Sequence, residues 1–109
     1  MTPAISESSL SRSGSAEIAA LDTEKVLLLD IRSSKECENN GIKGSVNVPF
    51  DEISTRLSKL SKDKPVYVLC RTGDLSEEVA EILEDRGYDV YNIEGGYAAY
   101  IVSLASAKL

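Results

Sequence analysis

Cys70 is the residue whose type and position best suit covalent chemistry. It follows the apolar run 66–69 and opens a polar loop, after which a helical pattern begins. A cysteine at a strand-to-helix turn faces the free backbone N–H groups of the helix start, and these donors, with the helix dipole, favour negative charge on sulfur. Because the thiolate is the nucleophilic form of cysteine, this position predicts an activated thiol.

The loop after Cys70 has the composition of an anion-binding turn. Its residues are Arg71, Thr72, Gly73, Asp74, Leu75 and Ser76. Glycine allows a positive φ, and successive inward N–H groups then form a nest around an anion. We expect Ser76 near the helix start and Asp74 in the loop. The alternative is a small buried cysteine without chemistry, which is common for free thiols.

The chain contains no histidine, which restricts the chemistry open to Cys70. Cys–His and Ser–His–Asp catalysis are excluded, so backbone dipoles and cations must activate any nucleophile. A cysteine-type phosphatase needs an arginine after five intervening residues to hold the phosphoryl group, and Ser76 occupies that position. Sulfur transfer demands less: a thiolate takes up a sulfane sulfur, becomes a persulfide and passes the terminal sulfur to an acceptor.

Size and charge bound the possible partners. A chain of 109 residues, 42% of them hydrophobic, suits one domain with a modest core. A net charge of −6 disfavours nucleic acid and anionic membranes as partners. No apolar stretch approaches the roughly 20 residues that span a bilayer, and the N-terminus lacks the pattern of a secretory signal. We therefore expect a cytoplasmic protein.

The two cysteines, Cys37 and Cys70, are too few and too far apart for a disulfide framework or a zinc site. Cys37 lies between Glu36 and Glu38, whose charges oppose thiolate formation. We interpret Cys37 as a packing residue.

Strand and helix patterns alternate along the chain. Apolar runs predict strands at 26–31, 46–48, 66–69 and 88–93. Helices are expected at 15–21 and 33–39, after Asp51, after the cysteine loop and after Gly96. This alternation predicts an α/β domain with a mainly parallel sheet over residues 15–109, preceded by a polar arm at 1–14.

In two of these helices the spacing of apolar residues predicts which face is buried. Ile53, Leu57 and Leu60 line one, and Val79, Ile82 and Leu83 line the other. In open parallel sheets, ligands bind beyond the carboxyl ends of the strands. Asp30 ends one predicted strand and Cys70 follows another, so we expect both at the same rim.

Three blocks of the sequence resemble the single-domain rhodaneses, a family of sulfurtransferases. The first comprises Asp30-Ile31-Arg32, Glu36 and residues 42–49; the second comprises residues 66–73 and Ser76; the third comprises Gly87-Tyr88 and residues 91–97. The blocks occur in the family's order, and the resemblance spans about residues 15 to 104.

The resemblance implies a rhodanese fold, a five-stranded, mainly parallel sheet with helices on both faces. It implies Cys70 as the sulfur-carrying nucleophile, the loop 71–76 as its cradle, Asp30 and Arg32 as structural support, and no metal or organic cofactor. The implied partners are thiosulfate or a persulfide as donor and cyanide, a small thiol or a protein as acceptor. A binding or regulatory module that keeps the fold without turnover is the alternative.

Charged residues near the two motifs add two further expectations. Arg32 and Glu36 have the i,i+4 spacing of a helical ion pair, which we expect to form. Asp74 departs from the basic or neutral residue common in the family's loop, and its carboxylate would repel the thiosulfate dianion, while Arg71 would attract it. We therefore expect weak thiosulfate activity and a persulfide donor; alternatively, Asp74 points outward as a helix cap.

Overall fold

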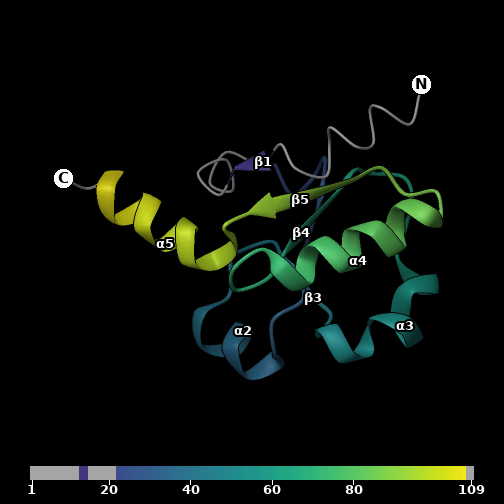
Figure 1. Ribbon diagram of the computed structural model, residues 1–109, viewed down its shortest axis with the longest axis horizontal. Helices are drawn as coiled ribbons and strands as arrows, with labels where there is room; N and C mark the ends of the chain where they lie inside the picture. The colour runs from purple at the N-terminus through teal and green to yellow at the C-terminus, as the bar shows by residue number, and fades with distance from the viewer. Residues whose placement is uncertain (1–12, 15–21, 108–109) are drawn as a thin grey trace.

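A parallel sheet with helices packed against it forms the body of the protein (Figure 1). The computed structural model describes residues 13–14 and 22–107. The expected helix at 15–21 and most of the expected arm at 1–14 lie outside these residues. Within the described residues, no helix has the length and apolar character needed to cross a bilayer.

Four parallel strands make up the sheet: β2 (Leu27–Asp30), β3 (Val46–Asn47), β4 (Val66–Leu69) and β5 (Val90–Glu94). A further piece, β1 (Ser13–Gly14), pairs in parallel with β5 and gives the order β1-β5-β4-β2-β3. The α/β class and the parallel sheet are confirmed. Five strands are reached only when β1 is counted; β2, β3, β4 and β5 form one continuous four-stranded parallel sheet, and β1 adds two residues to its edge.

The register of the central strands sets where the chemistry-bearing residues emerge. Leu27 lies opposite Val66, and Asp30 lies opposite Leu69. Asp30 and Cys70 therefore leave the sheet at the same carboxyl edge, as the sequence predicts.

The helices are interrupted more often than the sequence predicts. They are α2 (Ser34–Asn40), α3 (Ile53–Arg56) between the 3-10 turns η2 (Phe50–Glu52) and η3 (Leu57–Lys59), α4 (Asp74–Asp85) and α5 (Gly96–Ala107). The single helix expected after Asp51 is thus three short pieces. Helix α2 begins after Ser33, whose hydroxyl accepts the Glu36 N–H.

One face of the sheet is covered by α3, η3 and α4. Ile53 and Leu57 are buried there, as predicted. On α4, Val79 and Leu83 are buried, but Ile82 is 41% exposed, which corrects the predicted face. Each residue turns a helix by about 100°, which places Ala80 with Val79 and Leu83 and leaves Ile82 outside the buried arc.

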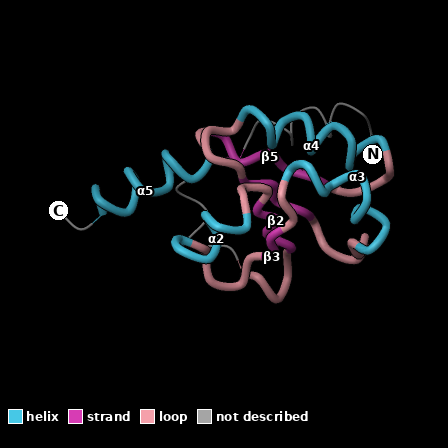
Figure 2. The backbone as a smooth tube through the Cα atoms, turned by 90° about the horizontal axis from the view of Figure 1, so that it is seen from below, coloured by secondary structure: helices cyan, strands magenta, loops and turns pink. Residues whose placement is uncertain are grey.

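The other face carries a second apolar cluster. Leu28, Leu69 and Ile93 form its centre, and Tyr97 and Tyr100 from the first turns of α5 pack against it. Helical side chains therefore contact both faces of the sheet. Beyond these turns α5 extends away from the sheet, as Figure 2 shows.

The two positions on α4 give a matched test of this packing. Leu83→Ala should lower the free energy of unfolding by about 2–5 kcal/mol, because it empties a fully buried site. Ile82→Ala should cost about 1 kcal/mol or less, because much of its side chain already contacts water. Urea unfolding of the two variants measures both values, and equal losses would show that Leu83 and Ile82 contribute equally to the core.

Candidate active site

The sulfur of Cys70 lies in a cradle of backbone N–H groups. Cys70 follows β4 directly and is 4% exposed. The N–H of Gly73 donates to Sγ at 3.0 Å, and that of Ser76 at 3.4 Å. Gly73 has φ +100°, a conformation that glycine adopts without strain. The loop therefore forms the predicted nest.

The helix behind the nest begins earlier than the sequence predicts. Asp74 is the first residue of α4 rather than part of the loop, and Ser76 lies within the first turn. The left-handed Gly73 completes the turn by itself, so the helix starts immediately after it. The N–H of Ser76 is consequently one of the free donors of a helix start, and together with the dipole of α4 it stabilises negative charge on Sγ.

A chain of buried hydrogen bonds fixes the shape of the loop. The hydroxyl of Ser76, which is fully buried, accepts a hydrogen bond from the Cys70 thiol at 3.3 Å and donates to Oδ1 of Asn92. Nδ2 of Asn92 donates to the carbonyl of Gly73 at 3.3 Å. Sequence reasoning missed Asn92 as a site residue. The sequence signal for Asn92 is a polar residue within the otherwise apolar run 90–93. A buried side-chain amide there needs hydrogen-bond partners, which could have pointed to the nearby loop.

The start of α5 holds the loop from the other side. The N–H groups of Tyr97 and Ala98 donate to the carbonyls of Cys70 and Arg71 at 2.9 and 3.0 Å. A Cβ at Gly96 would lie 2.3 Å from the Cys70 carbonyl oxygen, so only glycine permits this approach.

A buried ion pair lies at the same rim. Asp30 and Arg32 are 0% and 5% exposed, and Arg32 donates from both Nε and Nη2 to the Asp30 carboxylate. Nη2 also donates to the Asn40 carbonyl at 3.0 Å, and the guanidinium lies 3.9 Å from the centre of the Tyr97 ring. These contacts link the end of β2 to α2 and to the start of α5, and the role of Asp30 and Arg32 as structural support for the site stays a prediction.

The predicted ion pair between Arg32 and Glu36 is wrong. Arg32 precedes the first residue of α2, so the helical i,i+4 geometry does not apply, and its side chain turns back to Asp30. Glu36 instead pairs with Arg71 of the cysteine loop. Burial alone would raise the pKa of Glu36, but the hydrogen bond and charge of Arg71 lower it overall.

The remaining loop residues face solvent around the sulfur. Arg71, Thr72 and Asp74 are exposed, and Leu75 is 45% exposed. The Thr72 hydroxyl donates to the Asp74 carboxylate at 3.4 Å. The rim of the site thus presents one cation, one carboxylate, one hydroxyl and one apolar side chain.

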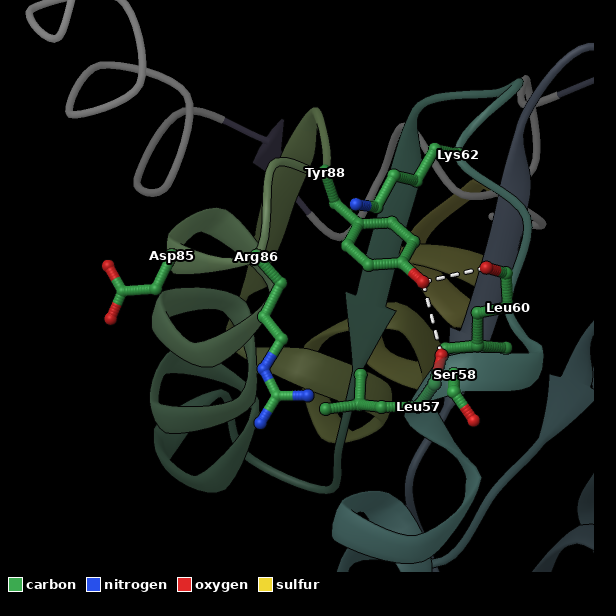
Figure 3. Close-up of a pocket in the computed structure, with 7 residues that line it drawn as sticks. All are labelled: Leu57, Ser58, Leu60, Lys62, Asp85, Arg86 and Tyr88. Carbon is green, nitrogen blue, oxygen red and sulfur yellow. Dashed lines mark hydrogen bonds between the residues drawn. The ribbon is translucent and has the colours of Figure 1, made fainter.

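A separate pocket of about 530 Å³ lies at the opposite, amino edge of β4 and β5 (Figure 3). It is lined by Leu57, Ser58, Leu60, Lys62, Asp85, Arg86 and Tyr88. The Tyr88 hydroxyl lies 3.1 and 2.6 Å from the Leu57 and Leu60 carbonyl oxygens. No predicted site residue lines this pocket, so it is distinct from the Cys70 site.

Comparison with known proteins identifies the architecture. The family model described as Rhodanese-like domain matches residues 17–102. The chain belongs to the rhodanese-like family. A protein named sulfurtransferase from Allochromatium vinosum is 38% identical over 80 residues, covering 72% of this chain and 75% of that protein. The thiosulfate sulfurtransferase GlpE of Pseudomonas savastanoi pv. phaseolicola is 33% identical, covering 72% and 74%.

A solved structure shows the same arrangement. Reduced CoADR-RHD of Bacillus anthracis matches with a TM-score of 0.81 and 31% identity. The match covers 92% of this chain but 18% of that one, so the rhodanese-like domain corresponds to a small part of that longer protein.

Cys37 is the second thiol of this rhodanese-like domain and is partly buried on α2. Burial, followed by the hydrogen bond to and the charge of Asp30, raises its pKa to about 11. The thiol is therefore protonated at neutral pH, and the interpretation of Cys37 as a packing residue stays a prediction.

The raised pKa makes Cys37 a slow target for alkylation. In a Cys70→Ser protein, where Cys37 is the remaining cysteine, the rate of iodoacetamide modification should stay low at pH 8 and climb as the pH nears about 11. Mass spectrometry measures the rate, with circular dichroism confirming that the protein is folded at each pH. A profile centred on the ordinary thiol value of 9 would contradict the described environment.

Loss of the buried carboxylate should destabilise the domain strongly. Asp30→Asn leaves the Arg32 guanidinium buried beside a neutral amide, which we expect to cost about 3–5 kcal/mol. Glu52→Gln provides a matched control, because it breaks the exposed pair with Arg56 and should cost about 1 kcal/mol or less. Urea unfolding compares the two; a similar small loss in both would show that the buried pair does not support the rim.

Proposed function

We propose that this rhodanese-like domain is a sulfurtransferase in which Cys70 carries the transferred sulfur as a persulfide. The observation that supports it most directly is the convergence of the Gly73 and Ser76 N–H groups on Sγ at the start of α4. The relatives named sulfurtransferases support the same class of activity.

In the first half-reaction the Cys70 thiol loses its proton to water and the thiolate attacks the outer sulfur of a donor. With thiosulfate, the new S–S bond forms as the donor S–S bond breaks, and its electron pair leaves with sulfite. With a thiol persulfide, the same pair leaves on the donor thiolate. The N–H groups of Gly73 and Ser76 favour the attacking anion because they are already oriented toward it.

In the second half-reaction an acceptor attacks the terminal sulfur of the Cys70 persulfide. Cyanide takes that sulfur to give thiocyanate, and the bonding electrons return to Cys70 as a thiolate. The loop 71–76 would enclose the persulfide anion, and Asp30 and Arg32 would keep the loop in place through the rim. Each step balances without a metal or organic cofactor.

Sulfur loading tests the proposal directly. After incubation with thiosulfate or a thiol persulfide, the intact mass should rise by one sulfur atom and return to its starting value on addition of cyanide. The Cys70→Ser variant should gain nothing. Cys37→Ser should load like the wild type, because Cys37 lies outside the nest.

Two results would overturn this function. Persistent loading of Cys70→Ser would show that another group carries the sulfur. No loading of the wild type from either donor would favour a binding or regulatory module that keeps the fold without turnover.

A further inference from the structure

The charge on the cysteine loop is set by residues far apart in the sequence. Arg71 is the one Lys or Arg between Cys70 and Ser76. Its guanidinium pairs with Glu36 of α2, a helix that Figure 1 shows next to the turn leading into α4. Asp74 forms no ion pair among the described residues, and its carboxylate accepts only the Thr72 hydroxyl there.

This arrangement leaves the loop 70–76 without an unpaired positive charge. Glu36 neutralises Arg71, while Asp74 adds a negative charge four residues after Cys70. The Arg71 side chain is 69% exposed, and Arg71 directly follows Cys70 in the chain, so the charge state of its guanidinium would act on an anion that approaches the sulfur from solvent.

We propose that Glu36 is a specificity-determining residue that restrains Arg71 and so biases the site toward sulfur donors with at most one negative charge over dianionic donors. The inference rests on the proposed sulfurtransferase function. It concerns the choice of donor and leaves the sulfur-carrying role of Cys70 unchanged.

The charge of the reacting species explains the bias. A thiolate and thiosulfate bring three negative charges together, and all three persist as sulfite leaves. A thiolate and an organic thiosulfonate bring two, and sulfinate leaves with one. The attraction between an unpaired Arg71 and the donor scales with the donor's charge. Pairing of Arg71 with Glu36 therefore weakens the binding of dianionic thiosulfate more than that of a monoanionic thiosulfonate.

The opposite role for Glu36 makes the opposite prediction. Arg71 has five N–H donors, and the ion pair with Glu36 uses one nitrogen. Glu36 would then orient the guanidinium for the donor, and its removal would weaken thiosulfate turnover. Two observations favour restraint of Arg71 over its orientation by Glu36. The pair is exposed, and Asp74 adds a second carboxylate to the rim, which repels a dianionic donor and forms no ion pair with Arg71 in the described part of the chain.

The experiment compares two donors that transfer the same outer sulfur. Thiosulfate is a dianion and methanethiosulfonate is a monoanion, and thiocyanate formation reports kcat/KM for both. Glu36→Gln should raise kcat/KM for thiosulfate about threefold and for methanethiosulfonate less than twofold, as expected for an exposed ion pair acting on two charges and on one. High salt should reduce both gains.

Glu38→Gln is the matched control. It removes the same charge from the same helix, from an exposed side chain with no ion pair among the described residues. It should leave the ratio of the two kcat/KM values nearly unchanged. In an Arg71→Gln background, Glu36→Gln should lose its selective effect, because the cation it restrains is absent.

The outcomes separate the two proposals. A fall in thiosulfate kcat/KM in Glu36→Gln, or a change equal to that in Glu38→Gln, overturns the restraint while Cys70 still loads sulfur. Failure of the wild type to load sulfur from either donor overturns the sulfurtransferase function itself, and the donor bias with it.

Discussion

The close approach of the start of α5 to the cysteine loop is the constraint on which the site depends. A peptide unit points its N–H and C=O in opposite directions, so a loop whose N–H groups face Sγ must turn its carbonyls outward. The N–H groups of Tyr97 and Ala98 donate to the outward carbonyls of Cys70 and Arg71. The start of α4 thus faces the sulfur and the start of α5 satisfies the back of the loop, which is possible because Gly96 has no side chain.

The polar groups around this loop are buried, which makes their pairing essential. Asn92 joins the Ser76 hydroxyl to the Gly73 carbonyl, and Asp30 neutralises Arg32. Among the side chains that the structure describes, every buried nitrogen and oxygen has a hydrogen-bond partner. Because an unpaired buried polar group is costly, such a complete network favours one arrangement of the loop over its alternatives.

Local pattern was enough to predict the elements that carry the site. The apolar run at 66–69 is β4 as found, and Cys70 and Asp30 lie at the predicted edge. The wrong prediction about charge pairs arose because a pairing rule based on sequence spacing depends on where the helix begins and does not consider distant residues. The i,i+4 rule was applied to Arg32, which precedes a helix that begins at Ser34, and the partner of Glu36 lies 35 residues away. Periodicity reports which face is buried, but it does not report which charges meet across the fold.

The contacts around Cys70 divide into two kinds that act differently on sulfur chemistry. The N–H groups of Gly73 and Ser76 are fixed by the backbone and act on Sγ whatever donor arrives. The charges of Arg71, Glu36 and Asp74 lie at the rim, where on the proposed function they would act on the donor and be screened by salt. Because the N–H groups of the nest do not depend on the rim charges, we expect substitutions at the rim to change donor preference while the nest stays in place. On the proposed function, reactivity is therefore a property of the fold, and selectivity is a property of a few surface side chains.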